Sequence, residues 1–291
     1  MKLKKIKSKL KNKIFAQFIK RNIDFFVIGG MKCGTTSLWH YLGQHPEIQA
    51  SKLKEPCFFS YNYKKGDYWY YNQFGKKNGK SQKLFDASPV YIHDERSAAL
   101  IHKYFPGTKL IALLRDPIER TISHYNFYSN PNSRFAKKNT PDRLDTRSFE
   151  VAIENDMQGI EKRTFYRYCS NSLYGKQLHE YLKYFDRKNL QVLDQADLLL
   201  KPKQTMLKIL IHVGVSNTSY FESFNIIDEK IVGAKSLELD KTNNFKKYNS
   251  LEYKHELSDE IERCLIEFFK KDVALLKSKF ELDFEWMKRY E

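Results

Sequence analysis

Lysine, glycine and hydroxyl residues follow an apolar run near the start of the chain. The run is "DFFVIGG", residues 24–30, and it leads into "MKCGTTSL", residues 31–38. Backbone N–H groups at the start of a helix bind anions, and a neighbouring lysine adds a positive charge. The stretch therefore predicts a phosphate-binding loop followed by a helix. Its predicted ligands are Lys32, Cys33, Gly34, Thr35, Thr36 and Ser37.

The order of residues in this loop differs from that of a nucleoside-triphosphate P-loop. A P-loop has the order G-x-x-x-x-G-K-[ST], in which the lysine follows the last glycine. Here Lys32 comes two residues before Gly34, and the hydroxyl residues follow that glycine directly. A P-loop kinase or NTPase also needs an acidic residue for Mg²⁺, and no Walker-B motif is found in the sequence. Such an enzyme stays a less favoured alternative.

A second candidate anion site lies in "LLRDPIERTISHY", residues 113–125. Arg115 ends a predicted strand as a planar, bidentate donor, and Ser123 follows eight residues later on the next helix. This arrangement predicts a clamp for a second phosphate. The alternative is that Arg115 forms a structural ion pair with Asp116. The two motifs together favour a nucleotide that is phosphorylated at both ends.

Apolar strands alternate with helical segments along the chain. The pattern predicts strands at residues 24–30, in "KLIALL" and in "NLQVLD", and helices at residues 35–43 and 202–214. Continuous apolar strands between helices are typical of a parallel sheet covered on both faces. We therefore expect an α/β fold, a single domain with a central parallel sheet flanked by helices. Ligands of such sheets bind at the carboxyl ends of the strands, where both anion-binding motifs lie.

Size and composition are those of a globular protein. The chain has 291 residues, 41% of them hydrophobic, which is enough for one large α/β domain. It has no run of 18 apolar residues that would indicate a transmembrane helix. Its cysteines are widely spaced and form neither a metal-ligand pattern nor a disulfide framework. They are Cys33, Cys57, Cys169 and Cys264. We expect no metal and a reducing, cytoplasmic setting.

Positive charge is concentrated at the N-terminus of a chain whose net charge is +16. Residues 1–21 contain nine Lys or Arg residues and no acidic residue. Apolar residues recur there at helical spacing, which is typical of a basic amphipathic helix on an anionic membrane surface. They are Leu3, Ile6, Leu10, Ile14 and Phe18. Such a helix would add peripheral contact with the inner membrane surface, whereas a solvated basic tail explains the same pattern. Both interpretations stay open.

The remaining residues, 22–291, are expected to form the domain itself. Within it, residues 129–164 are polar and charged and contain few large apolar side chains. We expect this segment to be an insertion or a lid over the site.

Six stretches of the chain occur in the order found in a known family. They read "FFVIGGMKCGTTSLWHYLGQHPEI", "KEPCFF", "GDYWYYNQF", "DASPVYI", "LIALLRDPIERTISHY" and "NSLYGKQLHEYLKYF". The chain thereby resembles the sulfotransferase family from about residue 24 to 215. It is most similar to the branch that contains the heparan sulfate N- and O-sulfotransferases. The resemblance implies the P-loop-kinase-like sulfotransferase fold.

The resemblance also implies a donor and a reaction. The donor of the family is 3′-phosphoadenosine 5′-phosphosulfate (PAPS), and its product is adenosine 3′,5′-bisphosphate (PAP), with no metal required. Residues 32–37 would hold the 5′-phosphosulfate, and Arg115 and Ser123 would hold the 3′-phosphate. The implied enzyme is a PAPS-dependent sulfotransferase (EC 2.8.2) that moves a sulfuryl group to a hydroxyl or an amine.

Two residues are candidates for catalysis. Negative charge builds on the leaving phosphate oxygen during transfer, and a fixed cation such as Lys32 would stabilise it. The acceptor must lose a proton to a general base, and Glu55, in "SKLKEPCFF", matches the catalytic glutamate of the family. From the residues alone, Glu55 is better explained as a surface carboxylate paired with Lys52 or Lys54. The resemblance favours the catalytic role.

One position departs from the family pattern. Related 3-O-sulfotransferases have a lysine that assists catalysis in the segment matching "FDASP", and here that position is Ala87. Asp86 and Ser88 are polar at this strand end but receive no role. His93 or His124 could compensate for the missing lysine, although a lone histidine near a core helix is more often structural.

The acceptor is the least specified part of the prediction. "FFSYNYKKGDYWYYNQF", residues 58–74, contains nine aromatic residues. Aromatic rings stack on sugar faces, so we expect a carbohydrate acceptor, such as a glycan or glycolipid. A lipid or a small phenol or alcohol is the alternative. About half of these rings are expected to be core residues.

Two further observations limit the prediction. The late 3′-phosphate loop of the family has no clear copy in this sequence. The stretch that could take its place is "NNFKKYN", residues 243–249, with Lys246 and Lys247.

A basic module that binds nucleic acid would explain the positive charge. However, no recognised nucleic-acid-binding motif accompanies that charge, so nucleic acid is not an expected partner.

Overall fold

The computed structural model describes most of the chain. The described residues are 20–76, 82–133, 135–136, 143–216, 218–223, 225–230, 244–247 and 257–291. For residues 223, 225–230 and 244–247 the backbone alone is described. The amphipathic helix predicted within residues 1–21 lies almost entirely outside this part of the chain.

A five-stranded parallel sheet forms the centre of the fold, with the strand order β2-β3-β1-β4-β5. Its strands are β1 (Phe25–Gly29), β2 (Ile48–Ala50), β3 (Lys83–Ala87), β4 (Lys109–Leu114) and β5 (Leu190–Asp194). A separate two-stranded sheet pairs β6 (Asn225–Lys230) with β7 (Asn244–Lys247). The predicted α/β class and central parallel sheet are confirmed.

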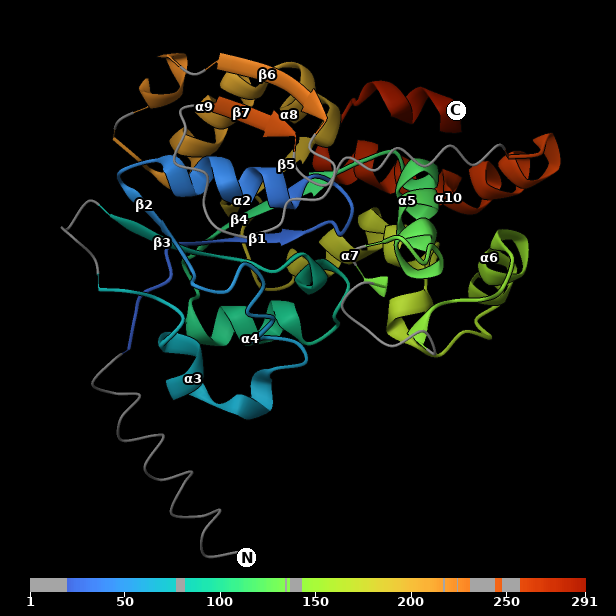
Figure 1. Cartoon of the computed structure of the whole chain (residues 1–291), viewed down its shortest axis with the longest axis horizontal. Helices are drawn as coiled ribbons and strands as arrows, with labels where there is room; N and C mark the ends of the chain where they lie inside the picture. The colour runs from blue at the N-terminus through green and yellow to red at the C-terminus, as the bar shows by residue number, and fades with distance from the viewer. Residues whose placement is uncertain are drawn as a thin grey trace, which may run out of the picture.

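Helices cover both faces of the five-stranded sheet (Figure 1). In that view α2, α8 and α9 lie above the sheet, whereas α3 and α4 lie below it. The first five are α2 (Thr35–Gln44), α3 (Asp67–Tyr71), α4 (Ser97–Tyr104), α5 (Pro117–Ser129) and α6 (Phe149–Met157). The others are α7 (Tyr174–Tyr181), α8 (Gln195–Leu200), α9 (Pro202–Val213) and α10 (Asp259–Phe280).

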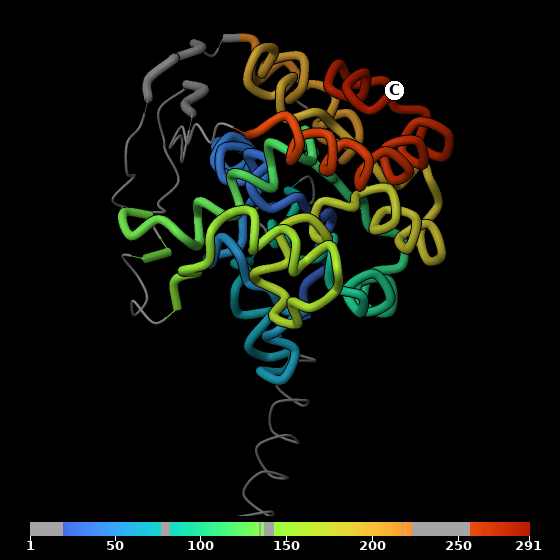
Figure 2. The backbone as a smooth tube through the Cα atoms, turned by 90° about the vertical axis from the view of Figure 1, so that its right-hand side faces the viewer, coloured from blue at the N-terminus to red at the C-terminus, as the bar shows by residue number. Residues whose placement is uncertain are grey.

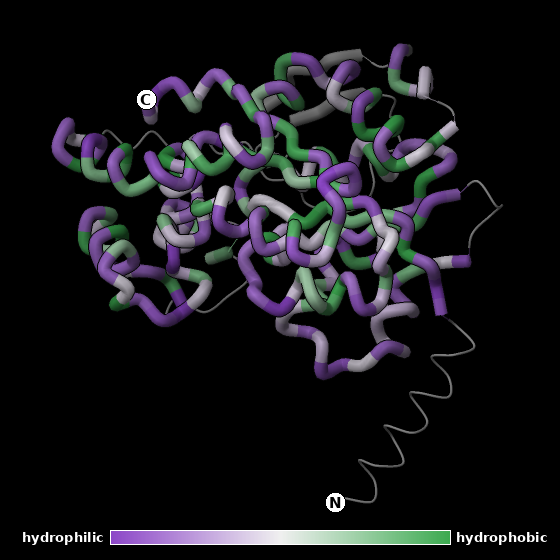
Figure 3. Tube along the Cα trace, turned by 180° about the vertical axis from the view of Figure 1, so that it is seen from behind, coloured by the Kyte–Doolittle hydropathy of each residue, from purple (hydrophilic) through white to green (hydrophobic). Residues whose placement is uncertain are grey.

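The core follows from the apolar character of the strands. Every residue of β1 is buried, because helices cover both faces of this central strand. Phe25 of β1 stacks on Phe85 of β3 with ring centres 5.0 Å apart. Figure 3 shows hydrophobic residues gathered towards the middle of the molecule and hydrophilic residues prevailing outside. Five of the nine aromatic residues in the stretch 58–74 belong to this core. They are Phe58, Phe59, Tyr70, Tyr71 and Phe74.

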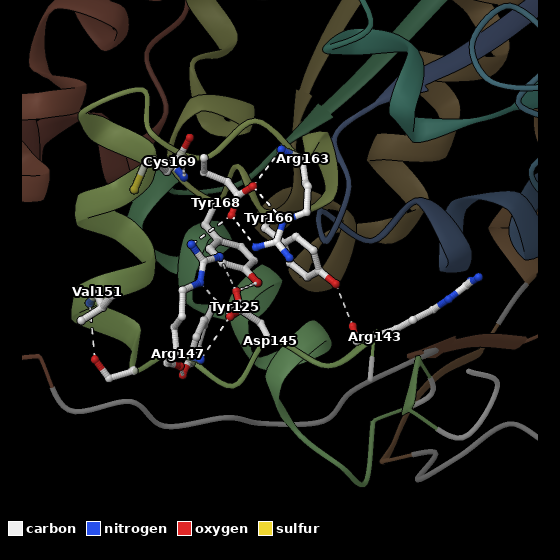
Figure 4. A network of polar contacts seen from close by, with 12 residues as sticks. Tyr125, Arg143, Asp145, Arg147, Val151, Arg163, Tyr166, Tyr168 and Cys169 are labelled. Carbon is white, nitrogen blue, oxygen red and sulfur yellow. Dashed lines mark hydrogen bonds and ion pairs between the residues drawn. The ribbon is translucent and has the colours of Figure 1, made fainter. Parts of the chain in front are cut away.

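The segment from Arg143 to Ser172 is tied to α5 by a network of charged and aromatic side chains (Figure 4). The Asp145 carboxylate accepts hydrogen bonds from Arg147 at 2.6 Å and from the Tyr168 hydroxyl at 2.7 Å. The Glu161 carboxylate pairs with Arg147 and Arg163, each at 2.9 Å. Both acids are buried, so the arginines supply the compensating charge that burial requires. This segment overlaps the expected insertion, whose role as a lid stays a prediction.

The C-terminal helix α10 supports α7 from outside the sheet (Figure 2). Asp272 of α10 accepts hydrogen bonds from the backbone N–H groups of Gly175 at 2.7 Å and Lys176 at 2.8 Å. These are groups at the start of α7 that have no partner within the helix. Asp272 therefore caps α7 from a distant part of the chain.

The close approach of α10 to α7 predicts a strict size limit at Gly175. A Cβ atom added there would lie well inside contact distance of the Asp272 carbonyl oxygen. We expect Gly175→Ala to lower the free energy of unfolding by ~1–3 kcal/mol, as overpacked sites do. Gly107→Ala is the control, because a Cβ at Gly107 would meet open space, and its unfolding midpoint in urea should not fall. Equal midpoints for Gly175→Ala and the wild type would contradict the packing described.

Candidate functional site

The two predicted anion-binding motifs meet where the direction of chain winding reverses. β1 lies between β3 and β4, so the loops that leave the carboxyl ends of β1 and β4 are neighbours. The Gly30 N–H donates to the Leu113 carbonyl at 2.6 Å and joins the two strand ends. Lys32 follows the first strand and Arg115 the second. Such a reversal point is where open parallel sheets bind their ligands.

The loop after β1 has two residues in the left-handed backbone conformation. Lys32 and Gly34 have φ angles of 67° and 86°, both in the left-handed region. This conformation is uncommon for a lysine and costs on the order of 1 kcal/mol, and such residues cluster at functional sites. Gly34 precedes α2 directly, so the helix starts at the predicted position.

The side chains of this loop do not all point the same way. Cys33 is buried, and its thiol lies 3.6 Å from the Tyr174 hydroxyl. Burial raises the pKa of the Cys33 thiol, and the Cys33 N–H donates to the Gly30 carbonyl at 3.2 Å, so this residue serves the loop structurally. Thr35 and Ser37 are also buried, whereas Thr36 is half-buried.

Lys32 lies in a concentration of positive charge. Its ammonium is 4.4 Å from the centre of the Phe127 ring, within the range of a cation–π interaction. Burial, followed by the charges of Arg115, Arg120 and Lys54, lowers the pKa of Lys32 to about 8. An anion bound here would relieve this repulsion, because it would supply the missing negative charge.

Arg120 is a fully buried cation beneath the loop, and sequence reasoning did not select it. Its guanidinium donates to the carbonyl oxygens of Met31 at 3.1 Å and Tyr168 at 3.0 Å, and to the Ser172 hydroxyl at 2.9 Å. It also contacts Nδ1 of His124 at 3.2 Å. Because the described partners of Arg120 are all neutral, its positive charge acts on the loop. The second arginine of "RDPIER", one turn into the helix, is the signal that could have identified it.

Asp116 has a structural role that leaves Arg115 available. Its carboxylate caps α5 by accepting from the N–H groups of Ile118 and Glu119 at 2.7 and 3.1 Å. It also accepts from the hydroxyl of Tyr290 at 3.0 Å, near the C-terminus. The alternative of an Arg115–Asp116 ion pair is therefore wrong.

Arg115 instead pairs with Glu119 at 2.9 Å, and both side chains are partly exposed. Ser123 is half-buried on the same helix. Glu119 and Ser123 are four residues apart and share one face of α5, whereas Arg115 lies two residues before the helix and reaches this face through its ion pair with Glu119. A phosphate at Arg115 would compete with Glu119, which is a carboxylate that water can reach. The predicted pair, Arg115 and Ser123, thus lies on one surface.

Glu55 lies on the segment that follows β2 and runs beside the end of β3. Two hydrogen bonds fasten this segment: Ser51 N–H to the Phe85 carbonyl at 3.2 Å, and Cys57 N–H to the Ser88 hydroxyl at 2.9 Å. The Glu55 side chain is 44% exposed and forms an ion pair with Lys54. This is the pairing predicted from the residues alone, and it leaves the carboxylate open to solvent.

Asp86 and Ser88 are parts of the core. The fully buried Asp86 carboxylate accepts hydrogen bonds from Ser88 at 2.6 Å, Tyr91 at 2.9 Å and Tyr70 at 3.1 Å. Burial raises the pKa of Asp86 to about 6. Through Ser88, this network holds the segment that carries Glu55.

The proposed compensation by His93 or His124 is wrong for a cationic role. Burial, followed by the charge of Arg120, lowers the pKa of His93 to about 3. The same two causes, in the same order, lower the pKa of His124 well below its ordinary value. Both rings are therefore neutral near pH 7. They cannot replace the positive charge of the lysine that related enzymes have at the position of Ala87.

The predicted lysines of the late loop and the expected absence of a metal concern two further parts of the site. Lys246 and Lys247 lie on β7, and their side chains are outside the described part of the molecule. Among the described residues, His, Cys, Asp and Glu side chains form no group that could hold a metal ion.

Comparison with protein families identifies the chain. The sulfotransferase domain matches residues 22–288, which is most of the chain. The chain belongs to the sulfotransferase family. The predicted family is confirmed, and the charged site at the ends of β1 and β4 lies within the matched region.

Curated relatives include enzymes of heparan sulfate. The chain is 38% identical over 140 residues to the membrane-associated sulfotransferase kil1 of Dictyostelium discoideum, which covers 47% of this chain and 29% of kil1. It is 29% identical over 228 residues to the mouse bifunctional heparan sulfate N-deacetylase/N-sulfotransferase 4, covering 75% of this chain and 25% of that protein. Mouse heparan sulfate glucosamine 3-O-sulfotransferase 3B1 is 28% identical over 65% of this chain and 45% of its own length. The chain thus spans less than half the length of these relatives.

Solved structures of sulfotransferases share the fold. The sulfotransferase from Alicyclobacillus acidocaldarius has a TM-score of 0.69 at 23% identity, covering 92% of this chain and 99% of that one. Mouse sulfotransferase SULT7A1, complexed with PAP, has a TM-score of 0.55 at 15% identity, covering 90% of both chains. The predicted sulfotransferase fold is confirmed.

The expected cytoplasmic setting is wrong in the light of these relatives. One of them is described as a membrane-associated sulfotransferase, and others act in heparan sulfate modification. Within the described ranges, none of the helices is sufficiently long and apolar to cross a membrane.

The crowding of cations predicts a measurable titration of Lys32. We expect the Lys32 ammonium to titrate near pH 8. We expect Arg115→Met to raise this pKa, because it removes one of the positive charges that lower it. The measurement is NMR of protein with ¹³C-labelled lysine, and Lys32→Met assigns the resonance. An unchanged titration midpoint in Arg115→Met would contradict the proximity of the two cations.

Proposed function

We propose that this chain transfers a sulfuryl group from PAPS to a hydroxyl or amine of a carbohydrate acceptor. The observation that carries the proposal is the cationic site at the ends of β1 and β4, where Lys32, Arg115 and Arg120 meet. The site lies inside a domain of the sulfotransferase family. Mouse SULT7A1, which shares the fold, was crystallised with PAP.

The charges at the site fit the phosphosulfate end of the donor. Backbone N–H groups of residues 34–37 and the Lys32 ammonium would hold the 5′-phosphosulfate, assisted by the hydroxyl of Thr36. Arg120 lies beneath this loop and donates only to neutral acceptors in the described part of the chain. Its positive charge is therefore available to compensate an anion. A helix start and buried cations together favour a doubly charged group.

The 3′-phosphate is assigned to Arg115, which lies just before α5, and to Ser123 on that helix. Arg115 offers a planar guanidinium, which binds phosphate through two parallel hydrogen bonds. Its present partner, Glu119, is exposed and can turn towards solvent. Exposed ion pairs of this kind contribute only ~0–1 kcal/mol, so exchanging the carboxylate for a phosphate costs little.

Lys32 and Glu55 have separate roles in transfer. PAPS supplies an activated sulfuryl group when it is bound. Lys32 stabilises the negative charge that develops on the leaving phosphate oxygen. Glu55, whose carboxylate is open to solvent, accepts the proton of the attacking hydroxyl or amine.

An exposed pair of aromatic rings supports a carbohydrate acceptor. Tyr61 and Phe165 are 48% and 46% exposed, and their ring centres lie 5.7 Å apart. Tyr61 is on the same connecting segment as Glu55, and Glu55 is one of the charges that raise the pKa of Tyr61, after burial. Flat exposed rings offer apolar surface to the faces of sugar rings. We call Tyr61 and Phe165 the ring platform.

Arginines lie on either side of the ring platform. The Arg96 guanidinium donates to the Ser60 carbonyl at 3.3 Å, next to Tyr61. Arg163 lies 4.2 Å from the ring centre of Tyr166, next to Phe165. Both guanidinium groups are exposed, although each is also paired with a carboxylate, Arg96 with Asp94 and Arg163 with Glu161. Acidic groups on a glycan chain would be attracted to them, in keeping with the heparan sulfate enzymes among the relatives.

The donor assignment is tested by comparing nucleotides. We expect PAP to raise the melting temperature more than AMP does, because Arg115 and Ser123 recognise the additional 3′-phosphate. At 100 times Kd a ligand stabilises by about 2.7 kcal/mol, which thermal unfolding resolves. Arg115→Ala should remove most of the difference between the nucleotides, and Arg263→Ala, on the exposed face of α10, should retain it. Equal shifts with PAP and AMP would refute the assignment.

The acceptor assignment is tested at the ring platform. With labelled PAPS and an N-acetylheparosan hexasaccharide, Tyr61→Ala and Phe165→Ala should each raise KM about tenfold, or ~1.4 kcal/mol, and change kcat less. PAP binding should not change. Tyr184→Ala, which removes an exposed ring elsewhere, is the control. Sulfation of a lipid or phenol but of no carbohydrate would refute the proposed acceptor class.

A further inference from the structure

A buried lysine lies next to the proposed general base. The Lys54 side chain is only 7% exposed, whereas that of its ion-pair partner Glu55 is 44% exposed. Lysine is almost never buried without a partner. The Lys54 ammonium is therefore fixed in place, with the carboxylate on its solvent side.

The segment that carries Lys54 is fastened on both sides to the end of β3. Before Lys54, Ser51 donates to the Phe85 carbonyl, and after it, Cys57 donates to the Ser88 hydroxyl. Between Phe85 and Ser88 lies Ala87, the fully buried and uncharged last residue of β3. Lys54 thus carries a positive charge on a segment that is hydrogen-bonded to this strand end.

Lys54 also faces the donor loop. After burial and the charges of Arg115 and Arg120, the Lys54 charge also lowers the pKa of Lys32. The Glu55 charge raises that pKa. The charges of the Lys54–Glu55 pair therefore both act on Lys32 in the proposed donor site. Two buried or half-buried ammonium groups this close repel each other, so the position of Lys54 is costly unless negative charge lies nearby.

We propose that Lys54 is a positioning residue for transfer, which holds the Glu55 carboxylate oriented towards the acceptor. This inference rests on the proposed function of the site. During the reaction the acceptor O–H or N–H bond breaks and its proton goes to Glu55. The Lys54 ammonium then lacks its counter-charge, so it interacts more strongly with negative charge that develops beside Lys32.

The ion pair is tested without any substrate by a cycle of variants. Glu55→Gln should lower the melting temperature, because it leaves a buried ammonium without a counter-charge, although Glu55 itself is exposed. Lys54→Met should lower it less, and the double variant Lys54→Met/Glu55→Gln should recover at least half of the loss. Additive losses in the double variant would overturn the inference, whether or not the protein has the proposed activity.

The role in transfer is tested by the pH dependence of turnover. With labelled PAPS and an N-acetylheparosan hexasaccharide, Lys54→Met should reduce kcat at least tenfold and move the acidic limb of the profile to higher pH. PAP affinity should stay within about threefold, and Lys54→Arg should restore part of kcat. The control is Lys52→Met, which removes an exposed lysine of the same segment and should behave as the wild type.

Two results separate failure of this inference from failure of the proposed function. A wild-type protein that neither binds PAP nor transfers sulfate would refute the proposed function, and the inference about transfer with it. Normal wild-type turnover together with an unchanged pH profile in Lys54→Met would overturn the role of Lys54 alone.

Discussion

The site depends on the concentration of positive charge at the carboxyl ends of two adjacent strands. β1 and β4 are hydrogen-bonded neighbours, so their loops cannot separate. Lys32 leaves one strand and Arg115 the other, while Arg120 is buried beneath both. Like charges this close repel each other, and the low pKa of Lys32 expresses that repulsion.

The acidic residues near the site are occupied in ways that maintain this imbalance. Asp116 caps α5 and binds the C-terminal Tyr290. Asp86 accepts three hydrogen bonds inside the core. Glu119 is the exception, because it pairs with Arg115, but it is exposed and can give way to an anion. A carboxylate that is committed to a cap or a buried network does not neutralise a neighbouring cation, so the positive field remains available to an anion.

The sequence predicted the parts of the site that depend on local order. The apolar strand, the loop and the helix start follow one another along the chain. Arg115 and Ser123 likewise come after β4 in chain order, the first before α5 and the second on it. Arg120 was not predicted, because its role arises from acceptors at residues 31, 168 and 172, which only the fold brings together. The binding of Asp116 by Tyr290 escaped prediction for the same reason, since 174 positions separate them.

Lys54 and Ala87 show why the absence of one motif residue is weak evidence that a catalytic site lacks a charge. A motif records positions along the chain, whereas electrostatic stabilisation depends on where charge lies in space. The end of β3 and the segment after β2 are joined by two hydrogen bonds, so either could carry a cation to the same region. Ala87 removes the possibility from the strand, and the buried Lys54 provides it from the neighbouring segment. The alanine therefore does not by itself imply that the site lacks a cation.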